Sequence, residues 1–96
     1  MSCRFFSYVI VSKSNGETYV GQTEDLRLRV LEHNDPQNRR TLYTKRRPGP
    51  WIIVHWETHS SRAEAMKRER FLKTGRGRQW IKENLAGWLA NPPSAP

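Results

Sequence analysis

The sequence predicts an α+β fold in which a small three-stranded, mainly antiparallel sheet is flanked by helices, in the order β-β-α-β-α-α. Two segments rich in β-branched and aromatic residues flank an Asn-Gly pair, which favours a tight hairpin. A short apolar run later in the chain predicts a third strand. Helix-capping residues precede the stretches in which apolar side chains recur at helical spacing.

The three strands follow from these patterns. Phe5–Val11 is apolar on both faces, and Thr18–Gln22 returns from a turn at residues 14–17. With Asn15-Gly16 as a two-residue type I′ loop, the two segments form an antiparallel hairpin. Trp51–Trp56 is a continuous apolar run, which indicates a strand covered on both faces.

The hairpin register decides where two tyrosines lie. A two-residue loop pairs Tyr8 with Thr23 and places Tyr8 and Tyr19 on one face, roughly 13 Å apart along the ladder. Gly21 lies between them and leaves that face open to close approach. A bulge or a longer turn would bring the two rings nearer. The other alternative is that both tyrosines are ordinary strand aromatics.

The first helix is expected to be capped by Thr23, with Glu24 and Asp25 in its first turn, and to end at His33 or Asn34. A polar, basic loop then leads to the third strand.

Two further helices are predicted near the C-terminus. Residues 61–64, Ser-Arg-Ala-Glu, are a capping box that begins a helix running to about Lys73. Residues 74–77 contain two glycines and interrupt it, and a short helix follows over residues 78–86.

Composition narrows the class of protein. The chain has 96 residues, enough for one domain, which we place at residues 1–88 with a disordered tail at residues 89–96. No apolar run is long enough to span a membrane, and the N-terminus lacks signal-peptide features. The single cysteine, Cys3, excludes an internal disulfide and a cysteine-based zinc site, so we expect a cytoplasmic protein.

Positive charge is concentrated in two stretches of the chain. The sequence has 17 Lys and Arg against 9 Asp and Glu, a net charge of +8. Clustered cations favour binding of DNA or RNA, because neutralising phosphates releases counterions. The alternative is a surface whose charge only increases solubility. The candidate nucleic-acid-binding residues are Arg39, Arg40, Lys45, Arg46, Arg47, Lys67, Arg68, Lys73, Arg76 and Arg78.

Two helices carry polar residues where apolar ones are expected. Glu69 lies in the apolar stripe of its helix, where it requires a raised pKa, a salt bridge to an arginine, or a metal ion. On the first helix, Arg29 and His33 share the apolar face. Either an anion lies between them, or His33 is a neutral core residue beside an arginine that extends its head group to solvent.

The ordered set of motifs resembles the GIY-YIG nuclease superfamily over about residues 5–85. Phe6-Ser7-Tyr8, ten intervening residues and Tyr19-Val20-Gly21 resemble its paired motif. Phe-Ser replaces the Gly-Ile of the first half, which leaves the tyrosine in place. The sequence is similar to the small single-domain bacterial type, and to the nuclease domain of the bacterial excinuclease and of phage homing endonucleases. The other matching segments are residues 25–29 with 33–34, 46–48, and 63–65 with 68–73.

The resemblance implies roles for five residues. Tyr8 and Tyr19 match the two motif tyrosines. Arg29 and His33 match the polar residues of the first helix, and Glu69 matches the carboxylate that holds one divalent ion, Mg²⁺ or Mn²⁺. These side chains are expected to surround one shallow basic groove on the sheet face.

The implied mechanism makes Tyr8 the leading candidate for general base, its pKa of ~10 lowered by Arg29 and the metal ion. Tyr19 would position water or phosphate, and His33 would handle protons or contact phosphate. Asn84 is the nearest match to a further polar residue that assists some family members.

The implied function is a metal-dependent DNA endonuclease, structure-specific or nonspecific, that acts in DNA repair or processing. The sequence contains no zinc finger or helix-turn-helix, so we expect cleavage guided by DNA shape or by a protein partner that supplies specificity. The alternatives are a non-catalytic nucleic-acid-binding module and a structural or protein-interaction domain.

Overall fold

The computed structural model describes residues 4–35 and 49–90. Within them, the predicted α+β class and the predicted order of elements are confirmed. The sheet has three strands in the order β2-β1-β3, with β1 antiparallel to both neighbours. The elements are β1 (Phe5–Ser12), β2 (Thr18–Thr23), α1 (Leu26–Asn34), β3 (Trp51–His59), α3 (Arg62–Leu72) and α4 (Gly75–Ala90).

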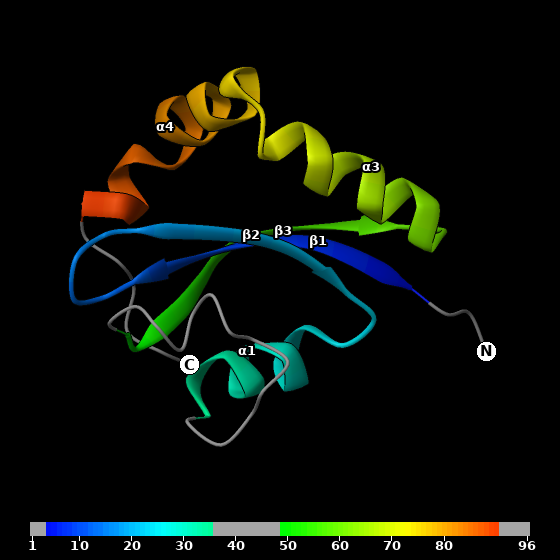
Figure 1. The fold of residues 1–96 in the computed structure, drawn as a ribbon, viewed down its shortest axis with the longest axis horizontal. Coiled ribbons are helices and arrows are strands. Elements are labelled where there is room, and N and C mark those ends of the chain that lie inside the picture. Colours follow the sequence, from blue (N-terminus) through cyan, green and yellow to red (C-terminus); the bar gives the residue numbers. More distant parts are fainter. Residues whose placement is uncertain (1–3, 36–48, 91–96) are drawn as a thin grey trace.

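The sheet separates two helical layers, with α1 on one face and α3 and α4 on the other (Figure 1). Because neighbouring residues of a strand point to opposite faces, the central strand β1 supplies both cores. Tyr8 and Ile10 pack with Trp51 on the α1 side. Val9 packs with Val20, and with apolar residues of α3 and α4, on the other side.

The hairpin register differs from the predicted one by two residues. Tyr8 pairs with Gly21 rather than with Thr23, and Ile10 pairs with Tyr19. Tyr8 and Tyr19 therefore lie two residues apart along the ladder instead of four. At this separation, one third side chain can contact both rings.

A longer turn causes this shift. The N–H of Ser12 donates to the carbonyl of Glu17 over 2.8 Å, so the loop spans residues 13–16 instead of Asn15-Gly16 alone. Gly16 closes the loop with a φ of 78°, in the left-handed region that glycine enters without strain. Asn15 accepts a hydrogen bond from the N–H of Glu17 at 2.9 Å and stabilises the turn with its side chain.

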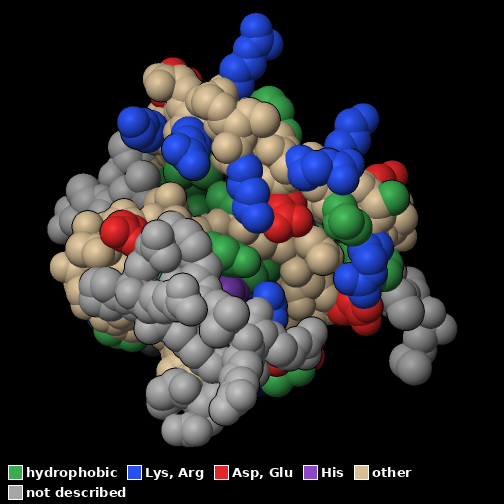
Figure 2. Space-filling model, viewed as in Figure 1, with side chains coloured by type: hydrophobic (Ala, Val, Ile, Leu, Met, Phe, Trp, Pro, Cys, Tyr) green, Lys and Arg blue, Asp and Glu red, His purple; other side chains and the backbone are tan. Residues whose placement is uncertain are grey.

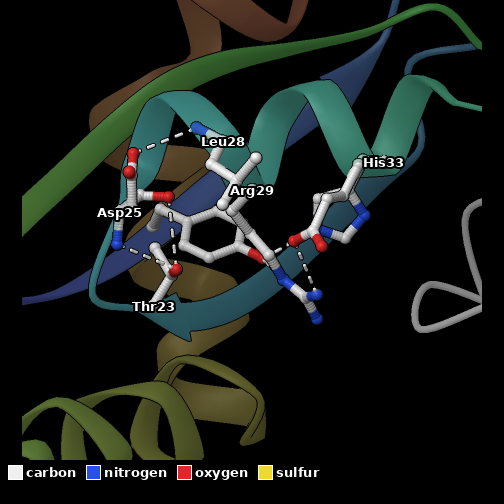
Figure 3. Close-up of polar contacts among 7 residues, drawn as sticks. Thr23, Asp25, Leu28, Arg29 and His33 are labelled. Atoms are coloured by element: carbon white, nitrogen blue, oxygen red, sulfur yellow. Dashed lines mark hydrogen bonds and ion pairs between the residues drawn. The ribbon is translucent and has the colours of Figure 1, made fainter. Parts of the chain in front are cut away.

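The first helix begins later than predicted and is tied to β3 at its end. Its N-cap is Asp25, which accepts from the N–H of Leu28 at 3.0 Å; Thr23 instead accepts from the N–H of Asp25 at 3.1 Å (Figure 3). The side chain of Asn34 accepts from the N–H of Trp51 at 2.7 Å and donates to its carbonyl at 2.9 Å. These bonds hold α1 against the start of β3.

The helices α3 and α4 meet at a sharp corner. Ser61 caps α3 as predicted and accepts from the N–H of Glu64 at 3.2 Å. The predicted helix over residues 78–86 is too short, since α4 already begins at Gly75 and continues to Ala90. Two residues of the expected tail are thus helical, and residues 91–96 lie outside the described chain. In residues 4–35 and 49–90, no helix has the length and hydropathy needed to cross a membrane.

We predict that Gly21→Ala destabilises the protein by about 1–3 kcal/mol, the usual cost of overpacking a core. A Cβ at Gly21 would lie 2.5 Å from the hydroxyl oxygen of Tyr8, and the Tyr8 side chain is completely buried. Urea unfolding monitored by circular dichroism measures the change. The control is Gly87→Ala in α4, where a Cβ meets nothing within 4 Å; it should leave stability unchanged or raise it by up to ~1 kcal/mol. Equal effects of the two substitutions would contradict the prediction.

Candidate active site

The hydroxyl of Tyr8 is the centre of a hydrogen-bond network between β1 and α1. It lies 2.7 Å from Nε2 of His33 and accepts from Nε of Arg29 at 3.3 Å. Arg29 also reaches Glu32 through Nη1 at 3.4 Å, an i, i+3 ion pair along the helix. Arg29 and His33 project from the same side of α1 (Figure 3), as the helical spacing predicts.

His33 is neutral in this network. The imidazole is 3% exposed, and burial together with the neighbouring Arg29 guanidinium lowers the pKa of His33 to about 4. When the single proton of neutral His33 is on Nδ1, Nε2 accepts from the Tyr8 O–H while the Tyr8 oxygen accepts from Arg29. A neutral imidazole removes the repulsion between Arg29 and His33.

Burial and Arg29 have opposite effects on the pKa of Tyr8. Burial raises the pKa of Tyr8 above its ordinary value, and the hydrogen bond and charge of Arg29 offset only part of this effect. Arg29 alone therefore does not bring Tyr8 toward ionisation near neutral pH, because the phenol is fully buried. Lowering of the Tyr8 pKa by Arg29 and a metal ion together stays a prediction.

Tyr19 joins the network through His33. The His33 ring lies edge-on to both tyrosines, with centroids 5.0 Å from Tyr19 and 5.8 Å from Tyr8. On its other side, the Tyr19 ring lies 5.7 Å from Nζ of Lys73 on α3. Tyr19, on the edge strand β2, thus contacts residues from both helical layers.

Glu69 approaches from the opposite side of the sheet to Tyr8. It lies on α3, and its partner is Lys73, whose Nζ is 2.9 Å from Oε2, rather than the arginine expected. Lys73 in turn lies over Tyr19, so Glu69 meets the other residues around the β2 edge instead of in a groove on the sheet face. Its charge still contributes to the raised pKa of Tyr8.

Apart from Arg68, the remaining candidate residues fall into three groups. Asn84 on α4 donates to the carbonyl of Trp80 at 2.8 Å, and no described contact connects it to the tyrosines. Lys67, Arg76 and Arg78 are exposed. The predicted cations of the loop lie outside the described residues: Arg39, Arg40, Lys45, Arg46 and Arg47.

Arg68 is engaged within the fold. Its Nε lies 3.0 Å from both carboxylate oxygens of Glu57, and its guanidinium lies 5.1 Å from the ring centroids of both Phe71 and Trp80. Glu57 also bonds to His55 at 3.0 Å, and these partners lower the pKa of Glu57 despite its partial burial. This cluster joins β3 to α3 and α4 on the face away from Tyr8.

The sequence interpretation missed two ion pairs within the candidate site and one cation beside it. The Glu69–Lys73 and Arg29–Glu32 pairs have helical spacings of four and three residues, a signal that was present in the sequence. Lys82 on α4 lines a cleft beside Tyr19, and only the tertiary structure brings it there.

The donor set fits one kind of metal ion. Among residues 4–35 and 49–90, no three His, Cys, Asp or Glu side chains form a metal-binding group. Glu69 is a single, partly exposed carboxylate. This set suits Mg²⁺ or Mn²⁺, which keep several waters and bind phosphate oxygens, and does not suit zinc.

Comparison with known proteins identifies similar sequences. A family model described as the GIY-YIG catalytic domain matches residues 4–84. A UPF0213 protein of Staphylococcus epidermidis is 37% identical over 73 residues, which cover 76% of this chain and 85% of that protein. A UPF0213 protein of Staphylococcus haemolyticus is 34% identical over 79 residues, which cover 82% of this chain and 92% of that protein. A UPF0213 protein of Staphylococcus aureus is 40% identical over 65 residues, which cover 68% of this chain and 76% of that protein. No solved structure matches the chain.

We predict that His33 stays neutral well below its ordinary pKa of 6.5 and titrates near pH 4. Because the unfolded chain takes up this proton at higher pH than the folded one, His33 should lower stability as pH falls from about 6.5 to about 4. NMR titration of the imidazole carbon-bound protons measures the pKa of His33 directly, and the partly buried His55 and His59 are followed in the same spectra. A His33 midpoint near 6.5 would contradict the prediction.

Proposed function

We propose a DNA endonuclease activity for this chain, which belongs to the GIY-YIG catalytic domain family. The observation that carries the proposal is the set of contacts around the β2 edge. There, Tyr8, His33 and Arg29 share hydrogen bonds, and Tyr19 and Lys73 connect them to Glu69. The reaction is structure-specific or nonspecific hydrolysis of a phosphodiester in DNA, and it serves DNA repair or processing in the cytoplasm. A protein partner is a source of specificity.

Glu69 would hold the divalent ion, Mg²⁺ or Mn²⁺, since Lys73 connects this carboxylate to Tyr19. When bound, the ion supplies charge neutralisation at the phosphate and at the leaving oxygen. For the divalent ion to bind, Lys73 must release Glu69. The ammonium of Lys73 then remains beside Tyr19 and attracts phosphate.

Arg29 would bind the phosphate that is cut. Its Nε is held by Tyr8 and its Nη1 by Glu32, which fixes the plane of the guanidinium and leaves its other N–H groups for phosphate oxygens. The half-buried position of Arg29 strengthens such a contact, because water competes less there.

Tyr8 and His33 would handle the proton together. Tyr8 is buried with a raised pKa, so it can accept a proton from water only if its own proton moves away. Nε2 of neutral His33, at 2.7 Å, is the acceptor placed for that proton. Tyr19, which is partly exposed at the β2 edge, would position the water or the phosphate.

A non-catalytic nucleic-acid-binding module is the second candidate. The observation that favours it is the closed state of the site, in which Tyr8 is fully buried and Glu69 is neutralised by Lys73. Both candidates use the same basic surface, so only a test of cleavage separates them.

Glu69→Gln tests the endonuclease proposal. The substitution keeps size and helix propensity but removes the charge that a divalent ion requires. Cleavage of plasmid and flap DNA in Mg²⁺ should fall by at least ~10²-fold, whereas DNA binding in EDTA should be unchanged or tighter. The control is Glu83→Gln on α4, an exposed carboxylate whose partner is Gln79; it should cut like the parent.

Thermal melts of the same preparations show whether Glu69 is structural. The Glu69–Lys73 pair is partly exposed, so its loss should change stability by less than about 1 kcal/mol. A Glu69→Gln protein that melts early and still nicks DNA at the parental rate would overturn the metal assignment. A parent protein that binds DNA but never cuts it in Mg²⁺ or Mn²⁺ would favour the binding module.

Arg29→Lys tests the phosphate assignment without a change of charge. Lysine has no planar fork, so it cannot bind Tyr8, Glu32 and a phosphate together. We expect cleavage to fall by at least about tenfold with little loss of DNA affinity. Arg27→Lys, on the exposed side of the same helix, is the matched control. Equal activities of the two variants would exclude a specific role for the Arg29 guanidinium.

A further inference from the structure

A cleft of about 600 Å³ lies between β2, the β1–β2 turn and the corner of α3 and α4. Its floor is apolar and formed by Val20, Leu72 and Ile81, which belong to the core on this side of the sheet. Tyr19 forms part of its wall. The mechanism proposed above uses Tyr19 and Lys73 but not the apolar floor of this cleft.

The rim of the cleft is strongly basic. Lys73, Arg78 and Lys82 line it, against one carboxylate, that of Glu17. Arg78 and Lys82 are exposed, and neither forms an ion pair with another described residue. Figure 2 shows Lys and Arg side chains gathered over α3 and α4 around patches of hydrophobic side chains. Such a rim attracts an anionic ligand.

The cleft is continuous with the candidate active site. Lys73 lines the cleft and contacts Glu69, and Tyr19 lines the cleft and contacts His33. A polymer bound at Arg29 and Glu69 therefore extends into the cleft next. A nucleic-acid strand matches both surfaces of the cleft, the cationic rim and the apolar floor. Its phosphates suit the cationic rim, and the faces of its sugars and bases suit an apolar floor beside an aromatic ring.

We propose that this cleft is the binding subsite for the nucleotide next to the cleaved phosphate, on the strand that is cut. The phosphate of that nucleotide lies between Arg78 and Lys82, and its sugar and base lie over Val20 and Leu72 beside Tyr19. This assignment rests on the proposed endonuclease function, and it adds the direction in which the strand leaves the site, from β2 toward α4.

The test compares two double variants that each remove two exposed cations. Arg78→Gln with Lys82→Gln removes the rim charges, and Arg27→Gln with Arg70→Gln removes the same charge outside the cleft. Binding of a fluorescein-labelled flap DNA in EDTA is measured by anisotropy over a series of salt concentrations, and thermal melts confirm that each variant is folded. Flap DNA presents duplex, junction and single-stranded phosphates together.

We expect the cleft variant to bind about tenfold more weakly and to lower the magnitude of the log–log salt slope by about two, one for each lost phosphate contact. The control variant should change affinity and slope much less. In NMR spectra of the parent with the same DNA, the amides of Thr18, Val20 and the first turns of α4 should shift. Equal effects of the two variants, or shifts confined to α1, would overturn the proposal.

Cleavage of the same DNA by the parent in Mg²⁺ separates this inference from the proposed function. If the parent cuts and the cleft variant binds like the control, the subsite is wrong and the endonuclease stands. If the cleft variant loses binding but the parent never cuts, the cleft binds DNA and the endonuclease proposal fails, together with the reference to a cleaved phosphate.

Discussion

The buried hydroxyl of Tyr8 is the constraint on which the rest of the site depends. A phenol oxygen that is removed from water must find hydrogen-bond partners inside the protein, and both of its partners come from α1. His33 and Arg29 therefore have to lie one helical turn apart and face the sheet. The same burial keeps His33 neutral, so that a histidine and an arginine lie side by side without repulsion.

The position of the Tyr8 ring also explains why the site forms at an edge of the sheet. The ring crosses the neighbouring strand at Gly21, the only residue type that leaves space for it there. β2 is an edge strand, so Tyr19, two residues earlier, can contact α1 on one side and α3 on the other. Two layers that the sheet otherwise separates meet at this edge, and Glu69 reaches the tyrosines from the far layer through Lys73.

Local patterns in the sequence were sufficient for the class of fold, the order of its elements and the unusual polar residues Arg29, His33 and Glu69. The hairpin register was predicted incorrectly because Asn15-Gly16 is locally the best two-residue turn, whereas the buried contact of Tyr8 with Gly21 requires a longer one. The direction in which the Tyr8 pKa is shifted could not be predicted, because the shift depends on how completely the phenol is buried. Burial is set by α1, which packs against the sheet from another part of the chain.

Charged residues are held in ion pairs in the candidate active site, whereas exposed cations line the cleft beside it. In the candidate active site, each carboxylate already has a cation, Glu32 with Arg29 and Glu69 with Lys73, and His33 adds no charge. Beside it, Arg78 and Lys82 have no acidic partner among the described residues. In the function proposed above, the exposed cations at the cleft attract the polyanion, while the paired groups are held in place by hydrogen bonds until a phosphate competes for them. This separation lets the affinity for nucleic acid change through exposed residues of α4 without disturbing the buried network around Tyr8.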